Sequence, residues 1–99
     1  MAIEKTFEPR YTAGQIVTSG VTSANVTLGF LSETVCLSNL GSVVVFIRVG
    51  MPGISASTAD YPVFPSSQVT VSKEIDADTV AFISPAGAGS LHILPGVGY

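Results

Sequence analysis

Apolar and polar residues alternate along most of the chain. Residues 26–30 read VTLGF and residues 68–72 read QVTVS, so every second side chain is apolar, as in a half-buried β-strand. The run Val43–Ile47 is apolar on both faces, which predicts a central strand that is covered on both sides. Between Thr12 and Leu94 no stretch shows the helical spacing of apolar positions at three, four and seven. The pattern predicts an all-β protein with antiparallel strands.

Turn-forming Gly, Pro, Asn and Asp residues separate these runs at near-regular intervals. Short strands at such intervals, about 8 to 12 residues, are typical of a sandwich or barrel. Pro62 and Pro65 reduce the fifth run to an edge strand or an irregular connection, because proline cannot donate to a ladder. We expect an antiparallel, jelly-roll-like β-sandwich of roughly seven or eight short strands, at 14–19, 24–30, 33–39, 43–49, 60–64, 68–73, 79–84 and 90–94.

The two ends of the sequence lack this pattern. The first dozen residues contain Phe7, Pro9 and Tyr11 without strand alternation, so we expect an extended N-terminal arm over 1–12 and a single β-sandwich domain over 13–99. The tail 95–99 contains two glycines and is expected to be too flexible for the core. Isolated aromatic residues on arms are suited to anchoring on a neighbouring subunit, since one buried ring supplies much of an interface's energy.

Composition adds a constraint on the surface. The 99 residues include only 11% charged side chains, against about 25% in a typical soluble domain. A folded monomer of this mass would expose roughly 5,300 Å², or about one charge per 480 Å². Such a charge-poor surface predicts that much of it is covered by other protein. The chain length also argues against a two-domain enzyme.

The charge balance disfavours two classes of partner. The net charge is −3, and the four basic residues are widely spaced, whereas a nucleic-acid backbone requires clustered Lys and Arg. The longest apolar run is Val43–Ile47, whereas a membrane-spanning helix needs about 20 residues. We therefore expect neither nucleic acid nor membrane as a partner.

The candidate catalytic residues are few. His92 is the single histidine, and no nucleophile elbow or triad order accompanies it. A cupin-type metal site would need several histidines and a carboxylate. We therefore interpret His92 as a solvated or interface residue. The single cysteine, Cys36, is interpreted as a small packing residue and fits a reducing compartment.

Two charged features have structural interpretations. Asp76 and Asp78, with Glu74 nearby, could offer oxygen ligands to Ca²⁺, but they are too few for that ion and favour a turn. Arg48 stands within the most apolar strand, so we expect an ion pair with Asp60 at a strand end or interface, because an isolated buried charge is costly. The glycines at 87, 89, 96 and 98 are followed by no predicted helix, so they predict no phosphate site. We expect no catalytic residue, no metal and no cofactor.

Three segments together resemble small virion proteins of tailed bacteriophages. They are TVCLSNLGSVVVFIRVG at 34–50, DYPVFP at 60–65 leading into QVTVSKE, and ILPGVG at 93–98. Their order is similar to that of the β-sandwich or jelly-roll proteins that decorate or cement capsids, and of related head-completion and tail-adaptor proteins. The chain departs from this pattern after Pro65, where Ser66 and Ser67 stand in place of a turn glycine.

The resemblance implies a non-enzymatic structural protein that binds and stabilises a phage head shell. Its implied partners are the major capsid protein and further copies of itself, as a trimer, in a virion assembled in the bacterial cytoplasm. Two alternatives remain open: a neck, tail or fibre-adaptor protein, and a carbohydrate- or peptide-binding β-sandwich module. Our predicted interface residues are Phe7, Tyr11, Arg48, Met51 and Tyr99.

Overall fold

The computed structural model describes residues 7–28, 32–74 and 76–97, and within them it contains strands and no helix. Eight strands lie where the sequence pattern predicts them, although residues 29 and 30 of the predicted strand 24–30 lie outside the described residues, and a further two-residue strand lies in the expected arm. They are β1 (Glu8–Pro9), β2 (Gln15–Ser19), β3 (Ala24–Thr27), β4 (Thr34–Asn39), β5 (Val45–Gly50), β6 (Tyr61–Val63), β7 (Gln68–Ser72), β8 (Thr79–Ile83) and β9 (Gly89–Val97).

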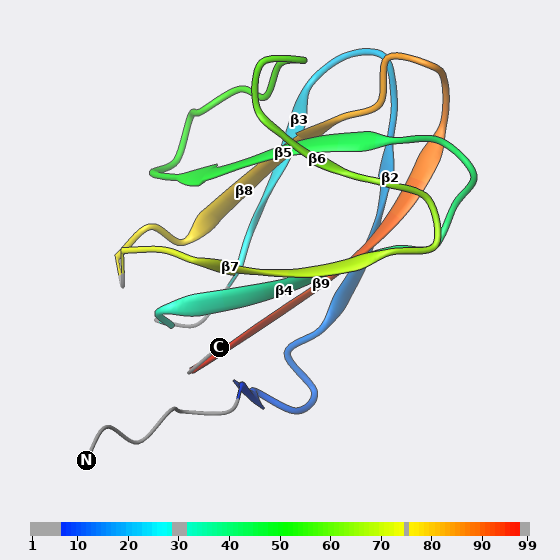
Figure 1. Cartoon of the computed structure of the whole chain (residues 1–99). Coiled ribbons are helices and arrows are strands. Elements are labelled where there is room, and N and C mark those ends of the chain that lie inside the picture. The colour runs from blue at the N-terminus through cyan, green and yellow to red at the C-terminus, as the bar shows by residue number, and fades with distance from the viewer. Residues whose placement is uncertain (1–6, 29–31, 75, 98–99) are drawn as a thin grey trace.

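The strands form two antiparallel sheets that face each other (Figure 1). One sheet has the order β2-β9-β4-β7. β1 lies on the same side of β9 as β2, and it pairs with Gly96 and Val97 at the end of β9. The other sheet has the order β3-β8-β5-β6. From β2 onward, every connection except β5 to β6 crosses from one sheet to the other. This is the double-sheet strand order of a jelly roll, so the fold class predicted from the sequence is confirmed.

The core lies between the two sheets and is made of alternate side chains of each strand. Leu37 and Ile93 are opposite one another on β4 and β9, and both are fully buried. Each such side chain contributes about 1.5–3 kcal/mol relative to full exposure. The buried cluster comprises Leu28, Val35, Leu37, Val45, Ile47, Val63, Val80, Phe82, Leu91 and Ile93.

The predicted central position of β5 in its sheet is confirmed, but the predicted cover on both faces is wrong, because Phe46 is only half-buried and Arg48 is exposed on the outer face. β5 lies between β8 and β6, and β6 is the edge strand that Pro62 predicts. The predicted start of β5 at Val43 is wrong, because the strand begins at Val45. Val43 lies in the turn, where its carbonyl accepts a hydrogen bond from the Asn39 side chain (2.8 Å).

Residues 7–12 and 95–97, the described parts of the expected arm and tail, are more ordered than the sequence suggests. In the expected arm, β1 pairs with Val97 and Gly96 of β9. The expectation that the tail would be excluded from the core is wrong for residues 95–97, because β9 continues to Val97 and both Pro95 and Gly96 are buried. Gly96 permits this packing because a Cβ there would lie only 2.6 Å from the Phe7 ring. In the described part of the chain no helix is long and apolar enough to cross a membrane.

Candidate functional site: a charge-free end of the sandwich

Four connecting loops gather at one end of the jelly roll. They are residues 20–23, 40–44, 64–67 and 84–88, the loops that follow β2, β4, β6 and β8. Hydrogen bonds join them to one another or to adjacent strand ends: Ser84 N–H donates to the Gly20 carbonyl (2.8 Å), Asn39 N–H, directly before the second loop, donates to the Ser67 carbonyl (2.9 Å), and Leu40 N–H donates to the Ser90 carbonyl in β9 (2.9 Å). These contacts hold loops from distant parts of the sequence as one surface, which we name the neutral end.

The neutral end contains no charged residue: its loops read GVTS, LGSVV, FPSS and SPAGA. Large apolar side chains nevertheless stand out from three of the four loops. Val21 is 66% exposed, Leu40 57% and Phe64 61%. Exposed apolar side chains on an uncharged surface are characteristic of the fully buried centre of a protein–protein interface.

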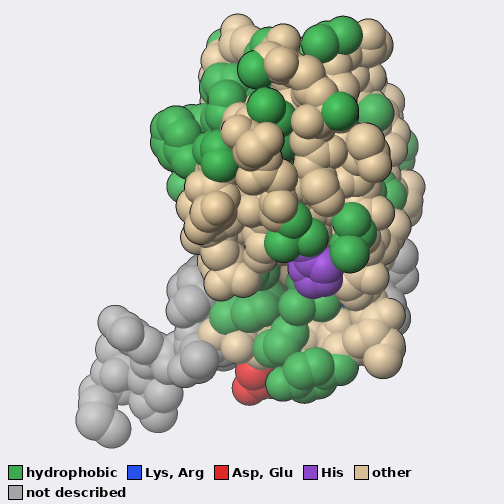
Figure 2. Space-filling model, turned by 90° about the vertical axis from the view of Figure 1, so that its right-hand side faces the viewer, with side chains coloured by type: hydrophobic (Ala, Val, Ile, Leu, Met, Phe, Trp, Pro, Cys, Tyr) green, Lys and Arg blue, Asp and Glu red, His purple; other side chains and the backbone are tan. Residues whose placement is uncertain are grey.

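The described charges all lie outside these loops. In Figure 2, which views the right-hand side of Figure 1, acidic side chains show only at the lower edge, and Lys and Arg are almost absent. The net charge is therefore concentrated away from the neutral end. The charged residues elsewhere are Glu8, Arg10, Glu33, Lys73, Glu74, Asp76 and Asp78, together with the pair Arg48 and Asp60 beside β5 and β6.

Local contacts stiffen the neutral end. The hydroxyl of Ser84 donates to the hydroxyl of Ser19 (2.9 Å), and both residues are buried. In the β6–β7 turn, Ser67 N–H donates to the Phe64 carbonyl (3.1 Å), and Ser66 takes a positive φ of 60°. A non-glycine residue in the left-handed region is uncommon and costs about 1–2 kcal/mol. The turn that presents Phe64 is thus held in a single, slightly strained conformation.

His92 lies on the outward face of β9, opposite Ile16 of β2. It is half-buried, and Figure 2 shows hydrophobic side chains beside it. Its neighbours Leu91 and Ile93 point into the core, so the alternation inferred from the sequence is confirmed. Cys36 is a free, buried cysteine, in agreement with a packing role.

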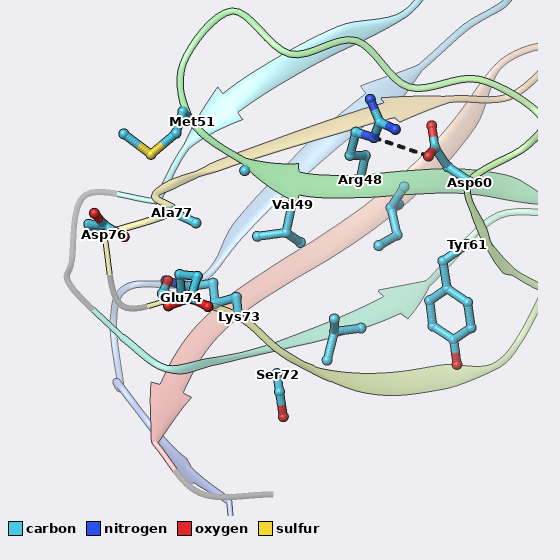
Figure 3. A pocket seen from close by; sticks show the side chains of 13 residues that line it. Arg48, Val49, Met51, Asp60, Tyr61, Ser72, Lys73, Glu74, Asp76 and Ala77 are labelled. Atoms are coloured by element: carbon cyan, nitrogen blue, oxygen red, sulfur yellow. Dashed lines mark hydrogen bonds and ion pairs between the residues drawn. The ribbon is translucent and has the colours of Figure 1, made fainter.

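A groove opens at the opposite end of the molecule, between β5 and β7 (Figure 3). Its volume is about 600 Å³. Its floor includes Ile47, Val49 and Val71, and its rim is polar. At one rim Arg48 Nε lies 3.1 Å from Asp60 Oδ1, which confirms the predicted ion pair.

Lys73 lies at the other rim of this groove. Its ammonium group donates to the main-chain carbonyls of Ser32 and Glu74. Burial lowers the pKa of Lys73 below 10.5, an effect that the negative charges of Asp78 and Asp76 oppose. No group of three His, Cys, Asp or Glu residues that could hold a metal ion occurs in the described ranges.

The predicted interface residues do not form one surface. Phe7 is half-buried against Gly96 of its own chain, and Tyr11 is exposed in the turn before β2. Arg48 and Met51 line the groove, and Tyr99 lies outside the described residues. None of the described four lies at the neutral end.

Sequence reasoning missed Val21, Leu40 and Phe64 as a group. A usable signal was present, because the turns at 20–23, 40–44, 64–67 and 84–88 are all uncharged, whereas the turns at 51–60 and 73–78 carry Asp, Glu or Lys. In a jelly roll, alternate turns lie at the same end. Comparing the charges of alternate turns would have identified this surface.

Comparisons with known proteins identify the fold alone. No family model matches the chain, and no curated protein matches it. Among solved structures, a cupin superfamily protein of Desulfitobacterium hafniense DCB-2 aligns with a TM-score of 0.51 and 10% identity, over 98% of this chain and 83% of that one. PirA aligns with a TM-score of 0.54 and 12% identity, over 87% of this chain and 95% of its own.

The iron(II) form of HppE aligns with a TM-score of 0.53 and 10% identity, over 94% of this chain and 54% of its own. The fold is therefore shared with a protein that holds iron(II) as well as with other proteins. The described residues do not fit a metal site inside the sandwich, because the interior is lined by the apolar cluster and the single histidine, His92, points outward. These likenesses establish a cupin-like jelly roll as the fold of the chain.

Proposed function

We propose that this chain is a non-enzymatic structural protein of a virion, which decorates or completes the head shell of a tailed bacteriophage. In this proposal it acts as a homo-oligomer, and its neutral end docks on the major capsid protein. The observation that carries the proposal is the separation of charge, with exposed Val21, Leu40 and Phe64 at one end and the described charges elsewhere. The resemblance of residues 34–50 to phage head proteins supports the choice of partner.

The energetics of docking favour this end over other surfaces. Removing a charged group from water is costly, and the neutral end carries none. Full burial of Val21, Leu40 and Phe64 would contribute about 1.5–3 kcal/mol for each side chain. Because the loops are already joined by hydrogen bonds, docking would cost little additional conformational entropy.

The remaining surface is suited to the exposed side of such a protein. The charges beside the opposite end give the chain its net negative charge of −3, which favours solubility of an assembled particle. Repetition on a symmetric shell would multiply a modest contact many times. Trimers would support shell decoration, whereas rings of six or twelve copies would support a neck or tail position.

The proposal is tested by co-sedimentation with virus-like particles of a tailed phage assembled without this protein. The wild-type chain and Ile16→Asp should co-sediment, since Ile16 is 69% exposed on β2 and belongs neither to the neutral end nor to the groove between β5 and β7. Phe64→Asp should bind at least about tenfold more weakly, because an aspartate would be desolvated in the interface. Light scattering gives the mass of each free protein against the 10.2 kDa monomer.

A stable monomer that never co-sediments with particles would overturn the proposed function. Equal binding by Phe64→Asp and Ile16→Asp would leave the particle as partner but exclude the neutral end as the docking surface. Thermal unfolding of each variant distinguishes a lost contact from a lost fold.

A further inference from the structure

β5 is longer than the neighbouring strand that covers its edge. β6 pairs with β5 only from Val45 to Ile47, whereas β5 continues to Gly50 and remains paired with β8 along that length. Pro62 has no N–H, so the hydrogen-bonded pairs with β6 are Val45–Val63 and Ile47–Tyr61. By the same alternation, the N–H and C=O of Val49 point toward the edge where β6 has ended.

A second strand edge faces the same groove. β7 pairs with β4 alone among the described strands. Lys73 N–H donates to the Glu33 carbonyl, so the alternation along β7 directs the N–H and C=O of Ser72 away from β4. The groove is thus bordered by two strand edges, and Figure 3 shows it open between β5 and β7.

The floor of the groove is the incompletely covered margin of the core. Val49 and Val71 pack against the core cluster but are only partly buried. An extended segment that entered here would continue the line of β6, pair with Val49 and cover these valines with an apolar side chain. Addition of a strand to such an edge is an established mode of recognition, and an open strand edge is otherwise prone to unspecific pairing.

We propose that residues 1–6 of a second copy of this chain occupy the groove as an added strand, with Ile3 between Val49 and Val71. The segment reads MAIEKT; in an extended strand Met1 and Ile3 would share one face with Lys5, so that face would be apolar except at its C-terminal end. Lys5 would then approach the rim where Glu74 and Asp76 outnumber the one cation, Lys73. The segment therefore matches the groove in both hydrophobicity and charge.

The geometry favours a second copy over the chain's own segment. Residue 7 is fixed next to β1, which lies three strand spacings from β7 in the order β1-β9-β4-β7, about 14 Å. Four residues of extended chain, from Phe7 back to Ile3, span at most about 14 Å. A path around the sheet and past β7 into the groove is longer than this reach. The segment of a neighbouring copy has no such restriction.

This proposal supplies the copy-to-copy contact of the proposed assembly function, and it is tested without any particle. Two full-length populations are prepared with Cys36→Ser, one tagged with Ile3→Cys and the other untagged with Val49→Cys. After mixing and mild oxidation, a disulfide-linked dimer of one tagged and one untagged chain should form on a non-reducing gel. The matched control replaces Val49→Cys with Ile16→Cys, since Ile16 is 69% exposed on the opposite edge strand β2. It should give at least about tenfold less dimer.

A second measurement uses light scattering of the otherwise unmodified chain. Ile3→Asp should reduce the oligomer to monomer mass, whereas Ala2→Asp, on the other face of the segment, should leave the mass unchanged. Absence of the mixed dimer, or equal dimer in the control, overturns the proposal. So does a purely intrachain disulfide in an Ile3→Cys/Val49→Cys chain. If the mixed dimer forms but the chain does not bind particles, the addition of residues 1–6 as a strand is upheld and only the proposed function is overturned.

Discussion

The side-chain amide of Asn39, at the end of β4, donates a hydrogen bond to the main-chain carbonyl of Val63, at the end of β6 (2.8 Å). The same nitrogen donates to the Val43 carbonyl (2.8 Å), and Oδ1 accepts from Gly41 N–H (3.0 Å). Asn39 is 3% exposed. One buried side chain therefore joins the two sheets and fixes the loop that presents Leu40.

Replacement of Asn39 by alanine should destabilise the protein by about 2–4 kcal/mol, because two carbonyls and one N–H lose their partner. The measurement is urea unfolding, with the free energy extrapolated to water. Asn25→Ala is the matched control, since the Asn25 amide makes one exposed hydrogen bond, to the Ile54 carbonyl, and should cost under about 1 kcal/mol. Equal losses in the two variants would contradict a structural role for Asn39.

Gly96→Ala should release β1 from the edge of β9. A Cβ at position 96 would lie 2.6 Å from the Phe7 ring and closer still to the Glu8 carbonyl, so the segment must move. We expect a loss of about 1–3 kcal/mol and faster hydrogen exchange at Arg10 N–H, which donates to the Pro95 carbonyl. Gly20→Ala is the control, because no atom lies within 4 Å of its added Cβ. Unchanged exchange at Arg10 would contradict the packing of β1.

The strands were predictable because most of them pack one face on the core more closely than the other, which imposes a period of two on the sequence. β6 illustrates how local chemistry set an edge: Pro62 withholds a donor, and the strand lies at the margin of its sheet. The pairing of Arg48 with Asp60 followed from the cost of leaving a cation alone in an apolar run. The length of β9 was not predictable, because Gly96 is a favourable strand residue here only beneath the ring of Phe7.

The neutral end was not predicted because it is a property of loop arrangement. Val21, Leu40 and Phe64 are far apart in the sequence, and each alone is an ordinary exposed apolar residue. Only the jelly-roll topology, in which alternate connections return to the same end, brings them together. The aromatic residues of the arm are recognisable from local sequence alone, yet Phe7 packs against Gly96 of its own chain.

Lys73 should titrate below 10.5, since burial disfavours its charged form. In the pH range between this lowered pKa and 10.5 the unfolded chain binds more protons than the folded one, so stability should rise with pH there. Asp78→Asn should lower the pKa further, because the Asp78 charge raises it. The measurement is the Cε chemical shift of Lys73. A pKa of Lys73 at or above 10.5, or a higher pKa in Asp78→Asn than in the wild type, would contradict the prediction. Asp60→Asn is the control and should leave the pKa of Lys73 unchanged.

Ser66→Gly should stabilise the protein by about 0.5–1 kcal/mol. Ser66 holds a φ of 60°, and glycine adopts this conformation without the Cβ clash that costs about 1–2 kcal/mol; part of the gain is offset by the greater flexibility of glycine in the unfolded chain. Pro65 precedes it, and the hydrogen bond from Ser67 N–H to the Phe64 carbonyl closes the turn, an arrangement that normally has glycine at the third position.

Ser67→Gly is a control in the same turn, and it should change the stability in the opposite direction to Ser66→Gly. The Ser67 hydroxyl donates to the Phe64 carbonyl (2.6 Å), and this substitution should destabilise by about 0.5–1.5 kcal/mol because the hydrogen bond is lost. Thermal unfolding of both variants gives the sign of each change. If Ser66→Gly is stabilising yet weakens binding to particles, the strained turn serves to hold Phe64 in position for docking, which couples the conformation of one serine to the proposed interface.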